Sequence, residues 1–248
     1  MSESKRADLL LVELGLAESR TRAQALILAG RVYSDQVRIE KAGTRLAPGT
    51  TLTVTESLPY VGRGGLKLAA ALDRFGVDPL DKVCLDVGAS TGGFTDCLLQ
   101  RGARRVYAVD VGYGQLDWNL RNDQRVTVME RTNFRNVDKD ALPHDLDLAV
   151  VDVSFISLRL ILPRLRDFLG KGAEAVLLVK PQFEAGRGKV GKGGIVRDGD
   201  VREEALEGVL EAAVAQRFVV AGRMESPVRG AGGNVEYLVH LKWSGEEA

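Results

Sequence analysis

Residues 83–96 read Val-Cys-Leu-Asp-Val-Gly-Ala-Ser-Thr-Gly-Gly-Phe-Thr-Asp, and this stretch decides the fold. The apolar run Val83–Val87 predicts a buried strand, and a helical pattern follows from Gly93 to Arg101. Glycines between a strand and a helix let the backbone turn sharply and approach a ligand. The stretch therefore predicts a strand, a loop and a helix, with the loop at the strand end where open α/β sheets bind ligands.

The same alternation continues along the chain. Further apolar runs lie at Val106–Val109, Val126–Met129, Leu146–Val153 and Ala175–Val179, and helix candidates lie at Gln115–Arg121, Leu158–Leu169 and Arg202–Gln216. This order predicts a mostly parallel sheet covered on both faces by helices. No helix signal separates the last two runs, Arg217–Met224 and Val235–Trp243, so we expect an antiparallel final strand.

The first 60 residues have a different pattern. Asp8 can cap a short apolar helix that ends at Gly15. A second helix follows, capped either by Thr21 with Gln24 or by Ser19. Strand-like runs then lie at Arg31–Tyr33, Val37–Ile39 and Thr51–Val54. These short elements predict a small α+β domain.

A glycine-rich segment separates the two patterns. Pro59 ends the last strand-like run, and Gly62, Gly64 and Gly65 free the backbone before a helix expected from Lys67 to Phe75. We therefore expect an N-terminal domain at residues 1–58, a flexible linker at 59–66 and the sheet domain at 67–248.

The overall composition excludes several classes of protein. The 34 basic and 34 acidic residues cancel, which excludes a uniformly basic chromatin-type protein and a polyacidic tail. No run approaches the ~18 apolar residues of a membrane span, and no signal-peptide pattern is present. The two cysteines are too few for a disulfide framework, and the two histidines make a zinc site unexpected. We expect a soluble cytoplasmic protein that needs no metal.

The glycine loop favours a nucleotide-type cofactor. Asp110 ends the next apolar run 18 residues after Gly92, close to the ~20 expected for a carboxylate that accepts ribose hydroxyls. The dinucleotide fingerprint needs a glycine where Ser90 stands, whereas Asp86 just before the first glycine favours S-adenosylmethionine. The expected cofactor-binding residues are Asp86, Gly88, Ala89, Ser90, Gly92, Gly93, Phe94, Asp110, Val111 and Asn133.

Two other motifs compete with this interpretation. Residues 88–92 match the G-x-S-x-G elbow of hydrolases, and the chain order permits a triad of Ser90, Asp152 and His240. His240 lies inside an alternating strand, whereas that fold supplies its histidine from a loop, so the hydrolase is the weaker alternative. Residues 186–193 approach a Walker A motif but end in glycine instead of Ser or Thr. There we expect a basic loop that contacts RNA phosphates or closes over the active site, with a plain mobile loop as the alternative.

Charged residues border four of the elements. Asp152 and Lys180 each end an apolar run, Glu236 opens the last run, and Lys67 begins the helix after the linker. Charges in such places are costly unless they are paired or useful. Since parallel strands end at one edge of the sheet, Asp152 and Lys180 are expected beside the glycine loop. Two ordinary salt bridges would be the alternative, but the whole set favours a functional site.

The N-terminal pattern resembles the S4 RNA-binding domain over residues 5–55. The likeness rests on three motifs, Gly15-Leu-Ala-Glu-Ser-Arg20, Ala23-Gln-Ala-Leu-Ile27 and Ala29-Gly-Arg-Val32. The stretch from Arg20 to Leu46 holds six basic residues and two acidic ones. This local positive charge suits RNA binding, but a solvated helix face would also explain it. The family usually has an Asn-Gly turn where this chain has Ser34-Asp35-Gln36.

The polar set has the order and contexts of the K-D-K-E tetrad of FtsJ-like RNA ribose 2'-O-methyltransferases. Together with the S4-like segment, the motifs at residues 85–96, 151–157 and 179–184 resemble the TlyA family. This family methylates cytidine ribose in ribosomal RNA, and some members carry a hemolysin label. The resemblance implies a Rossmann-like methyltransferase sheet, S-adenosylmethionine as methyl donor, and ribosomal RNA or ribosomal subunits as the partner.

The resemblance also implies roles for the tetrad. Lys180 is the expected general base, and Asp152 would orient it and favour the cationic methyl donor. Lys67 would be the neighbouring cation that favours the neutral form of Lys180, or it would hold the ribose or the phosphate. Glu236 would position Lys67 or the ribose. The expected RNA-binding residues are Arg6, Arg20, Arg22, Arg31, Arg63, Arg187, Lys189 and Lys192. A non-catalytic RNA- or S-adenosylmethionine-binding protein, acting in ribosome assembly or like a hemolysin, is the alternative, but a pure binder has no need for the complete tetrad.

Overall fold

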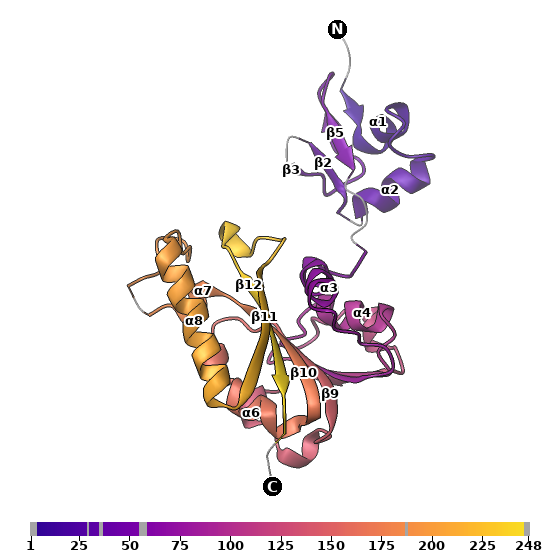
Figure 1. Cartoon of the computed structure of the whole chain (residues 1–248). Helices are drawn as coiled ribbons and strands as arrows, with labels where there is room; N and C mark the ends of the chain where they lie inside the picture. Colours follow the sequence, from indigo (N-terminus) through magenta and orange to yellow (C-terminus); the bar gives the residue numbers. More distant parts are fainter. Residues whose placement is uncertain (1–3, 29, 35–36, 55–58, 187, 246–248) are drawn as a thin grey trace. The chain divides into compact units, whose positions relative to one another are not determined.

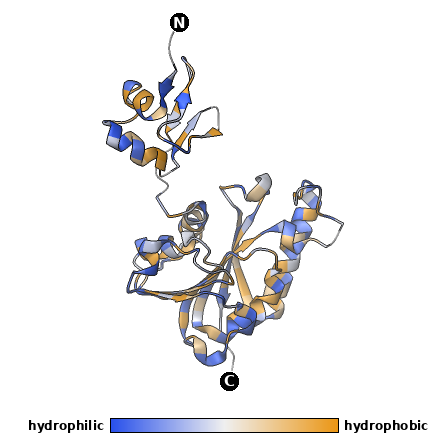
Figure 2. Ribbon diagram, turned by 180° about the vertical axis from the view of Figure 1, so that it is seen from behind, coloured by the Kyte–Doolittle hydropathy of each residue, from blue (hydrophilic) through white to orange (hydrophobic). Residues whose placement is uncertain are grey.

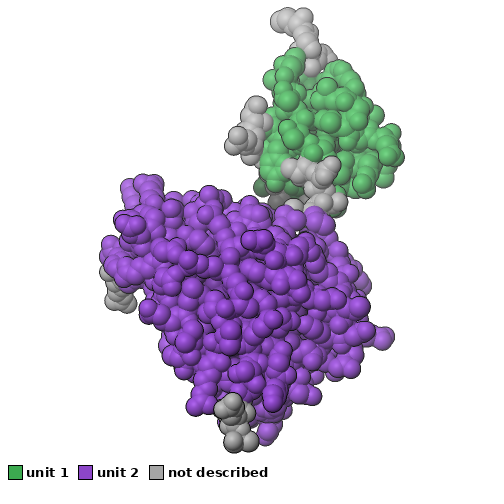
Figure 3. Space-filling view, viewed as in Figure 1, with its two compact units in different colours: residues 1–58 green, residues 59–248 purple. Residues whose placement is uncertain are grey.

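The computed structural model describes residues 4–28, 30–34, 37–54, 59–186 and 188–245. The chain divides into two compact units, Met1–Leu58 and Pro59–Ala248 (Figure 3). Each unit has its own apolar core. Within the described ranges, no helix combines the length and the apolar character needed to cross a membrane.

The first unit packs two helices against short antiparallel strands. The helices are α1 (Ala7–Glu13) and α2 (Arg20–Leu28), and the strands are β1 (Lys5–Arg6), β2 (Val32–Ser34), β3 (Val37–Arg38), β4 (Arg45–Leu46) and β5 (Leu52–Val54). Strand β2 lies between β3 and β5, and β1 pairs with β4. Leu11, Ile27 and Val32 are among the buried residues of this core.

The starts of the two helices in the first unit differ in how they are capped. The prediction that Asp8 caps the first helix is wrong, because Asp8 lies inside α1 and its buried carboxylate binds other side chains. The second helix is capped by Ser19, whose Oγ accepts a hydrogen bond from the backbone N–H of Arg22 at 3.2 Å. Gln24 points its amide at Asp8 instead. The Ser34-Asp35-Gln36 turn falls partly outside the described residues.

The second unit is built on a seven-stranded sheet. Its strands are β6 (Val83–Val87), β7 (Arg105–Val109), β8 (Val126–Met129), β9 (Leu146–Val151), β10 (Leu169–Val179), β11 (Phe218–Glu225) and β12 (Tyr237–Trp243). The order is β11-β12-β10-β9-β6-β7-β8, and only β12 runs antiparallel to its neighbours. The expected antiparallel last strand is thus confirmed.

Helices cover both faces of this sheet (Figure 1). One face carries α3 (Arg63–Phe75) and α4 (Gly93–Gln100), and the other carries α6 (Leu162–Leu165) and α8 (Gly199–Ala215). Along β9, Leu148 and Val150 pack on the first face, whereas Ala149 and Val151 pack on the second. Strands buried on both faces read as continuous apolar runs, while the helices mix polar and apolar residues (Figure 2).

Several helix boundaries differ from expectation, and α8 begins at Gly199 where Arg202 was expected. The helix α3 begins at Arg63, so residues 63–66 form its first turn and are not linker. The helix α5 is short, Trp118–Arg121. The stretch expected as one helix at Leu158–Leu169 consists of a 3-10 turn at Leu158–Leu160, α6, and a 3-10 turn at Arg166–Phe168. Pro163 lies in the first turn of α6, where its missing N–H is tolerated but a longer helix could not continue through it. A further short helix, α7 (Pro181–Glu184), follows β10.

Candidate active site

The glycine loop after β6 is held against the ends of two neighbouring strands. Gly88 has a φ of +87°, and a Cβ there would lie 2.3 Å from the carbonyl oxygen of Asp152, so only glycine fits. The carboxylate of Asp110, after β7, accepts hydrogen bonds from the backbone N–H groups of Ser90 at 2.7 Å and Gly112 at 2.6 Å. These contacts shape the loop before any ligand binds.

A cavity of 440 Å³ opens at this edge of the sheet. Five of the expected cofactor-binding residues line it, namely Gly88, Ser90, Asp110, Val111 and Asn133. Sequence reasoning missed several others, including Gln115, Thr132, Phe134, Ile156 and Ile161. No local pattern singles out these residues, since they come from separate parts of the chain.

The chemistry of the cavity fits a nucleoside-type cofactor. The carboxylate of Asp110 has lone pairs beyond the two that accept backbone N–H groups, so it can also accept ribose hydroxyls. Val111, Phe134 and Ile161 supply an apolar wall suited to a base. The residues present therefore fit S-adenosylmethionine.

The other expected cofactor residues do not line this cavity. Gly92 has a φ of +98°, which favours glycine, and a Cβ there would lie 2.3 Å from Cδ1 of Leu120 in α5, so that side chain would have to move. A Cβ on Gly93 would lie 3.0 Å from the backbone nitrogen of Gly65, at the start of α3. Ala89 and Phe94 are buried in the same core. Ala89, Gly92, Gly93 and Phe94 therefore pack the glycine loop against the core and do not line the cofactor cavity.

Asp86 lies fully buried at the end of β6. Its Oδ2 accepts a hydrogen bond from the Thr95 hydroxyl at 2.6 Å, and its Oδ1 has no partner among the described residues. Burial raises the pKa of this carboxyl to about 7, and the negative charge of Asp152 acts in the same direction. Asp86 therefore holds the start of α4 through Thr95 and does not line the cofactor cavity.

The tetrad residues form two ion pairs. Lys180 Nζ lies 2.6 Å from Oδ1 of Asp152 and donates a hydrogen bond to Ser154 Oγ at 2.8 Å. Lys67 Nζ donates to Oε2 of Glu236 at 2.5 Å, and both of these side chains are buried. Residues 169 positions apart in the sequence thus meet at one point.

All four residues line a second cavity of 320 Å³. This cavity shares Asp152, Ser154 and Phe155 with the cofactor cavity, so the two spaces meet at these residues. Phe155 is 91% exposed and has a φ of +64°, a conformation that non-glycine residues rarely adopt. Its ring lies 5.0 Å from that of Phe183. The sequence pattern did not reveal this exposed phenylalanine, which lies beside the half-buried Phe183.

The hydrolase alternative is wrong. His240 lies in β12 opposite Val176 of β10, and its Nε2 lies 3.0 Å from Glu174 Oε1. Its ring stacks on Phe75, and burial lowers its pKa. The hydroxyl of Ser90 instead donates to Gln115 Oε1 at 3.2 Å. The described residues also contain no cluster of His, Cys, Asp or Glu side chains able to hold a metal ion.

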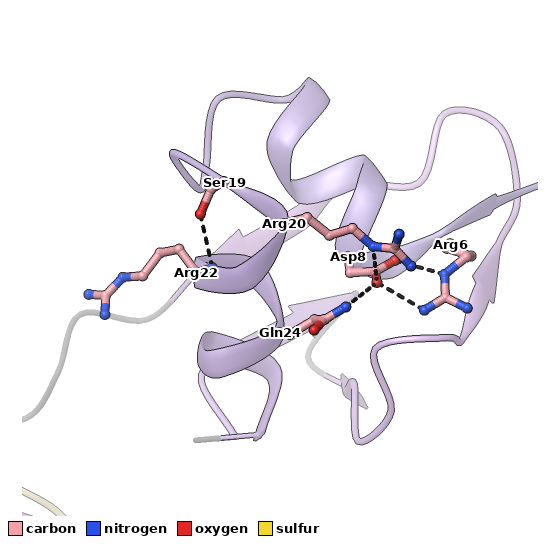
Figure 4. Close-up of polar contacts among 6 residues, drawn as sticks. All are labelled: Arg6, Asp8, Ser19, Arg20, Arg22 and Gln24. Atoms are coloured by element: carbon pink, nitrogen blue, oxygen red, sulfur yellow. Dashed lines mark hydrogen bonds and ion pairs between the residues drawn. The ribbon is translucent and has the colours of Figure 1, made fainter.

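In the N-terminal unit, two of the expected RNA-binding arginines are engaged internally (Figure 4). The buried carboxylate of Asp8 accepts hydrogen bonds from Arg6 and Arg20 and from the amide of Gln24. Their hydrogen bonds, that of Arg6 above all, lower the pKa of Asp8. Arg22 extends away from this cluster and is exposed. It is therefore better placed to contact a ligand.

The remaining basic candidates lie in different settings. Arg63 lines the tetrad cavity, together with Arg229, which sequence reasoning missed. Lys189 pairs with Glu204 of α8 at 2.5 Å, and Lys192 is exposed. Arg31 is partly exposed, and Arg187 lies outside the described residues.

Known proteins share both parts of this architecture. The FtsJ-like methyltransferase model matches residues 60–243, and the S4 domain model matches residues 5–52. The 16S/23S rRNA (cytidine-2'-O)-methyltransferase TlyA of Mycobacterium tuberculosis strain H37Rv is 46% identical over 100% of this chain and 93% of its own length.

Solved structures share the same fold. A protein from Streptococcus thermophilus, described as a hemolysin, superposes with a TM-score of 0.76 at 46% identity, covering 98% of this chain and 90% of its own. An S-adenosylmethionine-dependent methyltransferase from Listeria monocytogenes shares the fold at 13% identity, with a TM-score of 0.56 over 74% of this chain and 99% of its own. The chain therefore belongs to the FtsJ-like methyltransferase family and carries an S4 domain at its N-terminus.

Proposed function

We propose that this protein transfers a methyl group from S-adenosylmethionine to the ribose 2'-hydroxyl of a cytidine in ribosomal RNA. One observation carries the proposal: the cofactor cavity and the tetrad cavity meet at Asp152, Ser154 and Phe155. A methyl donor in the first cavity and a ribose in the second would therefore face each other across the tetrad. A ribosomal substrate would also place the protein in the cytoplasm.

Lys180 acts as the general base. When bound, S-adenosylmethionine supplies an electrophilic methyl group, and the enzyme has to remove the proton of a weakly acidic hydroxyl. Nζ of Lys180 accepts that proton, and the resulting ammonium is stabilised by Asp152 at 2.6 Å. The hydroxyl of Ser154, 2.8 Å from Nζ, helps to fix the direction of the amine.

Lys67 and Glu236 position the ribose. The buried ion pair of Lys67 and Glu236 lies in the same cavity as Lys180, and Glu236 balances the charge of Lys67 there. Lys67 Nζ has further protons to donate besides the one that Glu236 accepts, so it can hold a ribose oxygen. Correct alignment of the hydroxyl with the methyl group supplies a large part of the rate.

The RNA is held by aromatic and basic side chains around the tetrad cavity. Phe155 and Phe183 offer ring faces on which an unstacked base can rest. Arg63 and Arg229 line the same cavity and can bind the phosphates on either side of the target nucleotide. The S4 domain would contribute further RNA contacts, for which exposed Arg22 is the best-placed arginine of α2.

The test is transfer of labelled methyl from S-adenosylmethionine into ribosomal subunits from cells that lack the protein. Methylation of a 2'-hydroxyl blocks alkaline cleavage of the adjacent phosphodiester, so the label should appear in an alkali-resistant dinucleotide that begins with cytidine. Lys180→Ala should abolish transfer and retain cofactor binding, since Lys180 does not line the cofactor cavity. Label on a base, or undiminished transfer by Lys180→Ala, would contradict the proposal.

A further inference from the structure

The segment from Ser226 to Glu236, here called the carboxylate loop, joins β11 to β12 and forms one wall of the tetrad cavity. Its ends are tied together, because the backbone N–H of Ser226 donates to the carbonyl of Glu236 at 2.8 Å. A Cβ on Gly230 would lie 1.9 Å from Oε1 of Glu236, so the loop passes directly over the carboxylate. The position of this loop therefore decides where Glu236 can lie.

Asn234, a residue that is 3% exposed, anchors the carboxylate loop. Its Oδ1 accepts a hydrogen bond from the N–H of Val196 at 3.0 Å, and its Nδ2 donates to the carbonyls of Gly194 at 2.9 Å and Ala231 at 3.1 Å. Ala231 belongs to the loop itself, whereas Gly194 and Val196 belong to a separate segment. A single buried amide thus closes the loop and joins it to another part of the chain.

That other segment is a tight turn at residues 191–196. Gly191 and Ile195 form an isolated bridge, and Gly194 N–H donates to the carbonyl of Gly191 at 3.1 Å. The side chain of Ile195 packs at Gly232, in the carboxylate loop. The turn therefore packs against the carboxylate loop, and Asn234 supplies hydrogen bonds between them.

We propose that Asn234 is a positioning residue for methyl transfer, which holds the carboxylate loop so that Glu236 stays on Lys67. Only Val235 separates Asn234 from Glu236, so a shift at the anchor moves the carboxylate that lies 2.5 Å from Lys67 Nζ. This inference rests on the proposed function, since it concerns the same tetrad. It adds a residue that touches neither cavity.

The first test is Asn234→Ala in the full chain, assayed on ribosomal subunits. The variant should lose between about tenfold and a hundredfold in kcat, the usual cost of misplacing a reacting group. Its Kd for S-adenosylmethionine should be unchanged, because no residue of the turn or the carboxylate loop lines the cofactor cavity. Asn234→Asp should be as slow, since it keeps the acceptor for Val196 but sets a carboxylate oxygen against two carbonyls. Asn122→Ala is the control, because among the described residues the side chain of Asn122, at the C-terminal end of α5, bonds only to the carbonyl of Trp118.

The second test asks whether the effect passes through Glu236. In a Glu236→Gln background, adding Asn234→Ala should change kcat by less than about twofold, because the two changes remove one shared interaction. If Asn234→Ala costs as much in that background as in the wild type, the residue acts through general stability and the inference is overturned. Unchanged kcat in the single variant would overturn it too.

A third variant covers the case in which Asn234 variants do not fold. Gly230→Ala pushes on the carboxylate from the loop side and keeps every bond of Asn234, so it should lower kcat and spare cofactor affinity. An active Gly230→Ala would overturn the inference. Failure of the proposed function looks different, because the wild-type chain itself would then transfer no methyl to ribosomal RNA.

Discussion

At the scale of single residues, the buried carboxyl of Asp86 makes stability depend on pH. Its pKa of about 7 in the folded state lies above the ~3.9 of an unfolded chain. Between these values the folded state binds a proton that the unfolded state has released, so stability falls as pH rises from about 4 to about 7. Above that window the loss is constant.

Asp86→Asn should remove this dependence. The amide keeps an oxygen for the Thr95 hydroxyl and carries no charge, so the variant should exceed the wild type in stability at pH 8 by on the order of 2–4 kcal/mol. At pH 4 the two proteins should differ little. Urea unfolding of the second unit at several pH values measures this, and a difference that does not vary with pH would contradict the assignment.

Arg20 and Arg22, two residues apart on α2, should behave differently. Arg22→Ala should weaken binding to ribosomal RNA and reduce the log–log salt slope by ~0.7–0.9, because one phosphate contact is lost. It should leave the melting temperature unchanged, since no described contact of its side chain supports the fold. Anisotropy titrations over a range of salt concentrations measure both the affinity and the slope.

Unlike Arg22→Ala, Arg20→Ala should destabilise the first unit, because Arg20 donates a hydrogen bond to the buried carboxylate of Asp8 at 3.0 Å. The loss should be about 1 kcal/mol, since Arg6 and Gln24 still bind that carboxylate. Equal melting temperatures for the two variants would show that Arg20 has no structural role. RNA affinity that is indifferent to Arg22→Ala would mean that another face of the domain binds RNA.

At the scale of elements, the start of α3 shows why its glycines are there. The sequence favours a flexible linker at these positions, but Gly64 and Gly65 lie in the first helical turn. A Cβ on Gly65 would lie 2.3 Å from Cγ of Tyr60, whereas one on Gly64 would make ordinary contacts at 3.4 Å with Phe94. The glycines therefore permit close packing against their neighbours.

This difference predicts an asymmetry between two alanine variants. Gly65→Ala should cost about 1–3 kcal/mol of stability because Tyr60 has to move. Gly64→Ala should be neutral or slightly stabilising, since alanine favours helix over glycine by up to ~1 kcal/mol. If this segment were a flexible hinge, both changes would reduce turnover and neither would alter the stability of the fold. Thermal unfolding together with methyl transfer separates these outcomes.

At the scale of the whole molecule, two separate cores predict two unfolding transitions. The first unit has a small core of its own, and domains of about 60 residues are only marginally stable. S-adenosylmethionine at 100 times its Kd should raise the stability of the second unit by about 2.7 kcal/mol, because the cofactor cavity lies wholly within it.

Calorimetry with and without the cofactor tests this. The transition of the first unit should stay where it is, and that of the second unit should move upward. An Asp110→Ala chain is the control, because it lacks the acceptor expected to bind the ribose and should show a smaller shift. One cooperative transition that moves as a whole would mean that the two units unfold together.

Local patterns determined a large part of this protein. Strands buried on both faces need continuous apolar residues, so β6 to β10 could be located from their runs alone. Because parallel strands end at one edge, the positions of Asp86, Asp110, Asp152 and Lys180 after or at the ends of such runs already indicated where a site would form. The tetrad and the S4 motifs then indicated the family.

The tertiary structure alone decided what depends on contacts between distant segments. Lys67 meets Glu236 across 169 residues, and Asn234 meets Val196 across 38, so both contacts form only when distant segments pack together. The same holds for the packing roles of Gly65 and Gly92. Sequence periodicity reports which residues are buried, whereas the partner of a buried residue is set by how the elements pack together. For that reason the sequence predicted the edge of the sheet that carries the site, and the folded chain decided which side chains complete it.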